Sequence, residues 1–464
     1  MTALLILFIT GIAVLFAGLS GNRKLVSWIT VLGALAALGM AAMPLYCGDT
    51  SSWADAYKSM IYFDRYALSF SVVALLSTAL LAGLSVWGFR GLSETLGDHY
   101  ALILFSVCGA LTMFSYTNLV MLFLGIEIMS IPLYVLAGSR RDHLASNEAA
   151  LKYFLMGSFA TGILLFGMTL IYGSTATFDT AGIAAAIERG VLSPGMLKAG
   201  ILLMVIGLSF KVSAVPFHFW APDVYQGSPN MVTAFMATVV KTAGFAAFYK
   251  LFSTSFIGMQ EFWSVGIAGI AGITMTLANT TAIFQQDFKR MMAYSSISHA
   301  GYLMMAILVA GTPGSAGALL VYVLTYSVAS ITAFAAYMSV AEPNADGAFS
   351  AFNGLGKKQP LTAAIMAISM FSLAGIPPMA GFFGKYFLFS AVVGQYPWLV
   401  VLAVVNSAIS IYYYFKVVVA MYFAKEENTY EVAPSAPVQW ILLAGLLLTA
   451  ALTVMPGAVL HWIQ

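Results

Sequence analysis

Long apolar runs alternate with short polar connections along the whole chain. A run of about 20 apolar residues is long enough to cross the hydrocarbon core of a bilayer as one helix. The pattern predicts fourteen spans, at residues 2–20, 25–46, 66–89, 100–116, 118–138, 150–173, 196–220, 229–252, 262–284, 292–311, 315–341, 361–394, 398–423 and 438–461. The expected fold is therefore an all-α integral membrane protein with fourteen transmembrane helices.

Two of these spans are interrupted by proline and glycine. The seventh contains Pro216, with Pro222 just beyond it, and the twelfth contains residues 375–378 (GIPP) followed by Gly381. Non-helical backbone is tolerated at membrane depth only where it is buried in protein or lines a wet cavity. Two broken helices in corresponding halves of a chain are typical of transporters built from inverted repeats.

The connections between spans are short, so no extramembrane domain is expected. Residues 181–191 (AGIAAAIERGV) predict a short amphipathic helix at the surface. The first run has no basic segment before it and no A-x-A cleavage site after it, which favours a retained helix over a signal peptide.

The composition agrees with a chain that is embedded in a lipid bilayer. Hydrophobic residues make up 61% of the chain and charged residues 8%, whereas about a quarter of a soluble domain is charged. The net charge of +2 comes without a basic patch, which argues against nucleic-acid binding. The two cysteines, Cys47 and Cys108, fit no metal or redox spacing and are interpreted as packing residues.

Basic residues are unequally shared between the two sets of loops. With fourteen spans both termini lie on one side; the opposite loops hold ten Lys and Arg, including Lys289, and the loops on the terminus side hold five, including Lys250. Because Lys and Arg favour cytoplasmic loops, the sequence predicts that both termini lie on the non-cytoplasmic side.

Five of the 20 basic residues are left over, and all five fall inside predicted spans: Lys152, Lys211, Lys241, Lys385 and Lys416. Five lysines in a membrane cost on the order of 15 kcal/mol to insert, so a function is expected for residues of this kind. Lys211, Lys241 and Lys385 lie near mid-span. Lys152 and Lys416 lie nearer to helix ends, and we favour a function for Lys152 and snorkelling to the interface for Lys416.

Glu127 is the one acidic residue that lies clearly inside a span. A lysine buried in apolar surroundings gives up its proton more easily than one in water, and a nearby carboxylate opposes that effect. Glu127 and Lys211 are the candidate pair of this kind, although their spacing in sequence does not prove a contact. The row of buried lysines therefore predicts the movement of protons or another small cation.

Polar residues recur at helical spacing between these charges. They form three stripes: Ser295, Ser298, His299 and Tyr302; Tyr322, Tyr326 and Ser330; and Asn406, Ser410 and Tyr413. The hydroxyl groups are interpreted as contacts between helices. His299 is interpreted as a proton relay because histidine titrates near neutral pH. His218 is expected on the same helical face as Lys211.

Three segments carry a resemblance to a known family: residues 207–252 (GLSFKVSAVPFHFWAPDVYQGSPNMVTAFMATVVKTAGFAAFYKLF), residues 287–302 (DFKRMMAYSSISHAGY) and, less specifically, residues 375–387 (GIPPMAGFFGKYF). Over essentially its whole length the chain resembles the antiporter-like membrane subunits of respiratory complex I, the NADH-quinone oxidoreductase, and of Mrp-type sodium/proton antiporters. The wording of 207–252, Lys385 on span twelve and the end at Gln464 favour the subunit N branch.

The resemblance implies a particular organisation. Residues 1–99 would form spans one to three, 100–253 a first antiporter-like repeat (spans four to eight), 254–424 a second, inverted repeat (spans nine to thirteen), and 425–464 the last span. The broken helices would be the seventh and the twelfth.

The resemblance also implies a function. Glu127, Lys211, Lys241, His299 and Lys385, with Lys152 less firmly, would carry protons through a multi-pass subunit in the bacterial inner membrane. The chain has no Rossmann fingerprint, iron–sulfur cysteine set or flavin site, so it is expected to hold no cofactor or metal itself. NAD, FMN, iron–sulfur clusters and quinone would bind to other subunits. The expected partners are the other membrane subunits of the complex, including its antiporter-like subunits, and lipid.

Two alternatives stay open at this point. One is a cation/proton antiporter subunit of the Mrp type, and the other is a purely structural membrane-arm subunit that conducts no proton.

Overall fold

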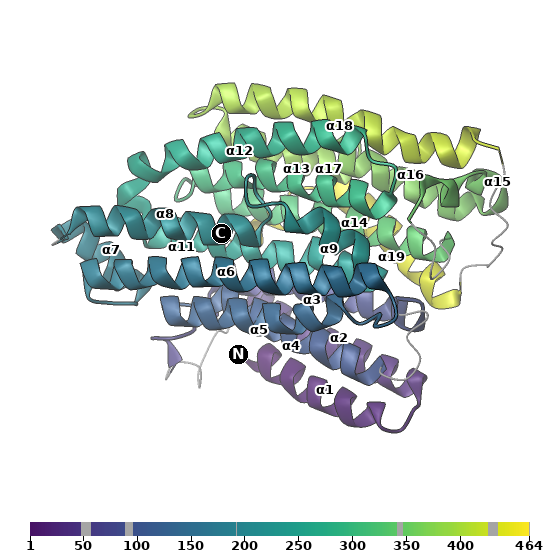
Figure 1. Cartoon of the computed structure of the whole chain (residues 1–464), viewed down its shortest axis with the longest axis horizontal. Coiled ribbons are helices and arrows are strands. Elements are labelled where there is room, and N and C mark those ends of the chain that lie inside the picture. The colour runs from purple at the N-terminus through teal and green to yellow at the C-terminus, as the bar shows by residue number, and fades with distance from the viewer. Residues whose placement is uncertain (48–56, 89–95, 192, 341–346, 426–434, 464) are drawn as a thin grey trace.

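The computed structural model describes residues 1–47, 57–88, 96–191, 193–340, 347–425 and 435–463. Within these ranges every regular element is helical, and eleven helices are long and apolar enough to cross a membrane. The helices run side by side in one bundle, with α1 and α18 at opposite edges (Figure 1). The all-helical membrane fold is confirmed, while the count of fourteen spans stays a prediction.

Helices occupy all fourteen apolar runs. They are α1 (Thr2–Gly18), α2 (Arg23–Cys47), α3 (Arg65–Gly88), α4 (Leu96–Ser115), α5 (Leu119–Ala137), α6 (Leu144–Thr175), α7 (Thr180–Arg189), α8 (Pro194–Lys211), α9 (Trp220–Gly227), α10 (Asn230–Phe235), a π-helical turn (Met236–Val240), α11 (Lys241–Thr254), α12 (Gln260–Ile283), α13 (Phe288–Leu308), α14 (Ser315–Val340), α15 (Leu355–Lys358), α16 (Pro360–Ala374), α17 (Ala380–Val392), α18 (Pro397–Phe423) and α19 (Ala436–Val454). Short 3₁₀ turns lie at Ile257–Met259, Phe349–Phe352 and Leu460–Trp462. The helix expected at 181–191 is α7.

Polar side chains mark where several helices begin. Asn118 accepts a hydrogen bond from the backbone N–H of Val120 at the start of α5, and Asp287 accepts one from the N–H of Arg290 at the start of α13. The side chains thus satisfy N–H groups that have no partner within the helix. The short Thr117-Asn118 connection between α4 and α5 is therefore a true helix boundary.

The centre of the bundle differs from its edges. The segment Asn230–Thr254 and α14 are buried along their most apolar windows, whereas α2 and α19 are 28% buried over theirs. Phe16, Trp28, Phe159 and Trp440 are exposed on peripheral helices. Large apolar side chains on an outer surface are what a lipid-facing helix requires, because lipid tails and not water surround it.

The two interruptions predicted from proline and glycine are present. The first lies between α8 and α9, where residues 212–219 form turns; the N–H of Val215 there donates to Oγ1 of Thr274 on α12 at 3.0 Å. The second lies between α16 and α17, where Gly375 has a φ of 78°. The helix before the first break already ends at Lys211. His218 therefore does not share a helical face with Lys211, and the expectation from the sequence was wrong on this point. Pro216 disturbs the preceding turn because its ring clashes with the carbonyl group four residues earlier.

Candidate functional site

Lys211 is the last residue of α8, at the edge of the first break. Its ammonium group donates to Oγ of Ser130 on α5 at 2.6 Å, and that hydroxyl group donates to the carbonyl oxygen of Ile126. The sequence thus places a charged group where a broken helix exposes its end, and a neighbouring helix supplies the acceptor.

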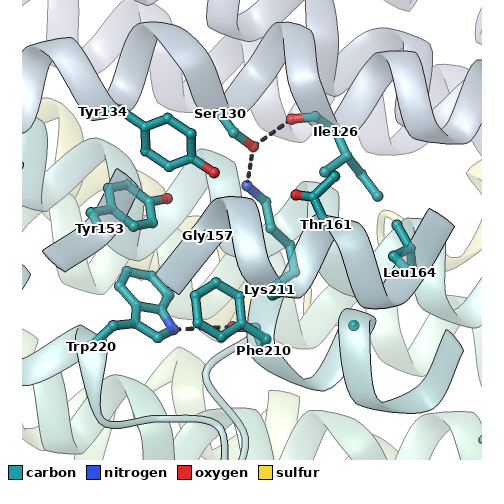
Figure 2. Close-up of a pocket in the computed structure, with 12 residues that line it drawn as sticks. Ile126, Ser130, Tyr134, Tyr153, Gly157, Thr161, Leu164, Phe210, Lys211 and Trp220 are labelled. Carbon is teal, nitrogen blue, oxygen red and sulfur yellow. Dashed lines mark hydrogen bonds between the residues drawn. The ribbon is translucent and has the colours of Figure 1, made fainter. Parts of the chain in front are cut away.

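A small cavity of about 20 Å³ adjoins Lys211 (Figure 2). This space is enough for roughly one water molecule. Its lining comes from α5, α6, α8 and α9, and includes Ser130, Tyr134, Tyr153, Thr161 and Trp220. The hydroxyl groups of Tyr134 and Tyr153 point to the side of the cavity on which the Lys211 ammonium group lies (Figure 2).

Glu127 lies on α5, less than one turn before Ser130. Its charge acts on both Lys211 and Tyr134, so Glu127 lies near both groups. The described structure, however, has no ion pair within 4.0 Å between Glu127 and Lys211; the lysine binds Ser130 instead, and Oε1 of Glu127 is buried without a hydrogen-bond partner. The pair is therefore close but not in direct contact.

Lys241 follows the π-helical turn of the segment Asn230–Thr254 and is 4% exposed. Its ammonium group donates to the carbonyl oxygen of Ser296 on α13. A Cβ atom added at Gly244, one turn further along, would lie 3.8 Å from Cγ of Lys211. This helix therefore links Lys211 to α13. π-helical turns are rare and occur often at functional sites.

His299 on α13 lies between two lysines. Its Nδ1 atom is 2.8 Å from the hydroxyl oxygen of Tyr322, and Nε2 is 3.2 Å from that of Tyr414. The charges of both Lys385 and Lys241 act on the ring. The imidazole thus joins hydroxyl groups from α14 and α18, on the stretch of α13 between Ser296, which binds Lys241, and Tyr302, which lies beside Lys385.

Lys385 on α17 reaches back across the second break. Its ammonium group donates to the carbonyl oxygen of Ala374, the last residue of α16, at 2.8 Å and to Oγ of Ser407 on α18 at 2.7 Å. It also lies 5.2 Å from the centre of the Tyr302 ring. The ammonium group therefore occupies the negative end of a half-helix.

Asn279 on α12 is a polar residue that the sequence analysis missed. Its Oδ1 atom accepts hydrogen bonds from the hydroxyl groups of Ser298 and Tyr413, both at 2.9 Å, and its Nδ2 group donates to Tyr302 at 3.2 Å. Two of the three predicted stripes, those on α13 and α18, thus meet around one amide. Its place in an apolar run (ITMTLANTTAI) was the available signal.

Lys152 lies apart from this row. It pairs with Asp223 of α9 at 2.5 Å and with Glu148 of its own helix at 2.6 Å, and Arg290 of α13 holds the other oxygen of Asp223 at 2.7 Å. Its side chain is 38% exposed. Sequence reasoning did not identify Asp223 as its partner.

Three further lysines bind the carbonyl ends of helices. Lys250 donates to the carbonyl oxygen of Phe114 near the end of α4. Lys289 donates to those of Gln226 and Ser228 at the end of α9, and Lys416 to those of Ile283 and Gln285 at the end of α12. Cations at these ends satisfy orphan carbonyl groups and the helix dipole. Lys416 is thus a helix cap in addition to lying near an end of its span.

Lys250 and Lys289 correct the loop assignment made from the sequence. Both were counted in loops, yet they are 8% and 5% exposed and lie within α11 and α13. Removing one from each set changes the count of loop charges from ten against five to nine against four. The orientation of the termini stays a prediction.

The described residues contain no group of three or more His, Cys, Asp or Glu side chains that would hold a metal ion. Cys108 is buried and free, while the side chain of Cys47 lies outside the described residues. The three lysines of the row, Lys211, Lys241 and Lys385, instead donate to hydroxyl or carbonyl groups.

Comparisons with known proteins show the family to which the chain belongs. The family model described as NADH:quinone oxidoreductase/Mrp antiporter, TM, matches residues 116–410. A protein named NADH-quinone oxidoreductase subunit N from Trichlorobacter lovleyi is 42% identical over 99% of this chain and 94% of its own length. One of the same name from Cytophaga hutchinsonii is 40% identical over 92% of each chain.

Solved structures extend the likeness to the fold. A chain of respiratory complex I from Thermus thermophilus is 33% identical, with a TM-score of 0.81, over 99% of this chain and 98% of that one. A chain of the Mrp complex from Dietzia is 21% identical with a TM-score of 0.83, over 100% and 96%; at that identity the likeness concerns the fold alone. The chain therefore belongs to the NADH:quinone oxidoreductase/Mrp antiporter transmembrane family, in the branch of NADH-quinone oxidoreductase subunit N.

Proposed function

We propose that this chain is a proton-translocating membrane-arm subunit of a bacterial NADH-quinone oxidoreductase. The observation that carries the proposal is the buried row in which Lys241, bound to Ser296, and Lys385, beside Tyr302, flank His299 on α13. Lys211 lies beside Gly244, one helical turn after Lys241. Groups that gain and lose protons are costly inside a membrane and are retained where a proton must pass. The relatives' names supply the reaction to which this passage is coupled.

Proton transfer along the row requires a change at its first member. The ammonium group of Lys211 is held by Ser130, and Glu127 lies near it with one oxygen unpaired. Movement of Glu127 towards the lysine stabilises the charged lysine, and movement away favours release of its proton. The proton then passes by Lys241 and His299 to Lys385. The order and direction of these steps belong to the proposal.

The chain acts within a larger assembly in this proposal. NADH oxidation and quinone reduction take place in other subunits, with NAD, FMN, iron–sulfur clusters and quinone as their cofactors. Neighbouring membrane subunits, including antiporter-like ones, drive the movement at Glu127. The proposal also includes fourteen transmembrane spans, inverted repeats at 100–253 and 254–424, and termini on the non-cytoplasmic side.

A cysteine-labelling experiment tests the orientation. Single cysteines near Arg140 and Lys357 are expected to react with a membrane-impermeant reagent from the cytoplasmic side, and a cysteine near Arg65 from the other side. Labelling of the Lys357 position only from outside contradicts the assignment.

Replacement of Lys211 by methionine tests the function. The change removes a charge from the membrane, so insertion and assembly are expected to be intact. Proton uptake by NADH-energised vesicles, and the quinone reduction coupled to it, are expected to fall by about 10-fold or more because a proton-transfer group is lost. Glu127→Gln also impairs both, and Glu127→Asp less so. Normal pumping by a fully assembled Lys211→Met complex favours a purely structural subunit.

The same vesicle assay distinguishes the Mrp-type antiporter from the proposed function. An antiporter subunit exchanges sodium for protons across the membrane without NADH, whereas the proposed subunit moves protons only while NADH is oxidised. Co-purification with NADH-dehydrogenase subunits adds independent support for the proposal.

A further inference from the structure

The cavity beside Lys211 lies next to the ion cluster of Lys152, Asp223 and Arg290. Tyr153 follows Lys152 on α6, and Trp220 begins α9 three residues before Asp223. The rings of Tyr153 and Trp220 are stacked with their centres 4.6 Å apart and their planes at 8°. This stacked pair therefore forms the wall of the cavity on the side of the half-exposed ion cluster.

Trp220 is fixed in this position by its own contacts. Its indole N–H donates to the carbonyl oxygen of Phe210 at 3.2 Å, one residue before Lys211. Asp223 holds the same half-helix to α6 through Lys152 and to α13 through Arg290. The wall is thus attached both to the broken end of α8 and to the ion cluster.

Tyr153 has a hydroxyl group without a partner. The residue is 2% exposed, its oxygen is buried, and no hydrogen bond to it is present in the described structure. A buried hydroxyl group left unpaired costs about 1–3 kcal/mol. A phenylalanine would keep the stacked ring without this cost, so packing alone does not account for a tyrosine here.

The cavity can hold a water molecule, and the Tyr153 hydroxyl group lacks a hydrogen-bond partner of this kind. Its volume of about 20 Å³ accommodates roughly one water molecule, which needs two to four polar partners. Lys211 and Tyr153 both line it, together with the hydroxyl-bearing residues Ser130 and Thr161, and the Tyr153 hydroxyl group points to the side on which the Lys211 ammonium group lies (Figure 2). A water molecule in this space has polar groups on both sides.

We propose that Tyr153 and Trp220 form an aromatic gate, and that the Tyr153 hydroxyl group holds a water molecule through which Lys211 exchanges protons with the side of the Lys152–Asp223 cluster. A proton arriving from that side is passed to the water, which gives one of its other protons to the neutral amine of Lys211. The water is unchanged at the end. The inference rests on the proposed function and adds the path by which Lys211 is loaded.

Tyr153→Phe tests the gate because it removes one oxygen atom and leaves the ring. Proton uptake by NADH-energised vesicles is expected to fall about threefold to tenfold. This loss is smaller than the one expected when a positioned proton-transfer group is removed altogether. The solvent deuterium isotope effect on uptake is expected to rise. Assembly and thermal stability are expected to stay close to those of the wild type, because the stacked ring is kept and only one hydrogen bond to the water molecule is lost. Tyr172→Phe, on the same helix and 44% exposed, is the matched control and is expected to change nothing.

Unchanged uptake and an unchanged isotope effect in assembled Tyr153→Phe complex overturn the gate. Loss of pumping in Lys211→Met with normal pumping in Tyr153→Phe refutes the gate alone, whereas normal pumping in both refutes the proposed function. Gly157→Ala is the second variant: its Cβ would lie 2.3 Å from the Tyr134 hydroxyl oxygen, so that ring must move within the cavity. It is expected to slow uptake similarly, and wild-type uptake in that variant also overturns the gate.

Discussion

The two broken helices hold their lysines in different ways. Lys211 ends the half-helix α8, and its ammonium group is held by one hydroxyl group of a neighbouring helix, with a cavity beside it and Glu127 nearby. Lys385 lies in the half-helix after the break and is held by the last carbonyl group of α16 and by Ser407. Lys211 has the Glu127 carboxyl group and a cavity nearby, whereas Lys385 is held by the dipoles of a helix-end carbonyl group and a serine hydroxyl group. The first is arranged to change its partner, and the second to keep it.

Replacement of each lysine by arginine is expected to have the largest effect. A guanidinium group stays protonated at any accessible pH, so both Lys211→Arg and Lys385→Arg are expected to lower NADH-driven proton uptake by about 10-fold or more. The measurement is uptake per NADH oxidised in vesicles, with assembly checked by native electrophoresis. Retained pumping in Lys385→Arg alone would mean that this lysine is a fixed charge and not a proton carrier.

Gly375→Ala is expected to have the next largest effect, and only at the second break. Gly375 has a φ of 78°, and an added Cβ would lie 2.8 Å from Cδ of Lys385. The backbone strain alone costs about 1–2 kcal/mol, and the lysine must leave the Ala374 carbonyl group. Reduced thermal stability together with reduced pumping is expected. Gly394→Ala, where the added atom meets nothing within 4 Å, is the control; equal behaviour of the two variants would contradict the fixed position of Lys385.

The serine partners of the two lysines are expected to differ in importance. Ser130→Ala removes the side-chain acceptor of Lys211, and pumping is expected to fall about threefold or more because a buried charge loses its hydrogen bond. Ser407→Ala leaves Lys385 bound to the Ala374 carbonyl group, so less than about a twofold change is expected. Uptake assays on the two variants side by side decide this, and a larger loss in Ser407→Ala would reverse the comparison.

Lys416→Met is expected to have the smallest effect on pumping. Lys416 caps the end of α12 and lies outside the proton row, so uptake is expected to stay near the wild-type rate. The lost interaction with the helix end lowers the free energy of unfolding by about 1 kcal/mol. Thermal unfolding and uptake measured on one preparation separate the two effects, and a strong loss of uptake with unchanged stability would place Lys416 in the relay.

Local pattern predicts the membrane segments and both breaks well, because the length of an apolar run and the backbone chemistry of proline act within the segment itself. It did not predict what lies across helices. Lys250 and Lys289 were assigned to loops from their distance to the ends of apolar runs, but the carbonyl groups that hold them belong to α4 and to the end of α9. Asn279 was missed for the same reason: its importance comes from Ser298 and Tyr413 on other helices.

The lysines at helix ends have a consequence for the order in which the chain is made. Lys250 binds a carbonyl group 136 residues earlier in the sequence, Lys416 one 133 residues earlier and Lys385 one 11 residues earlier. At roughly 5–20 residues per second of synthesis, the acceptors of Lys250 and Lys416 leave the ribosome about 7–27 seconds before these lysines do. Lys250 and Lys416 thus enter the bilayer after their partners, and Lys385 enters it together with its partner, in the same predicted span. Lys241 is different, because the Ser296 carbonyl group is made 55 residues later. Lys241 therefore enters the membrane before its acceptor has been synthesised.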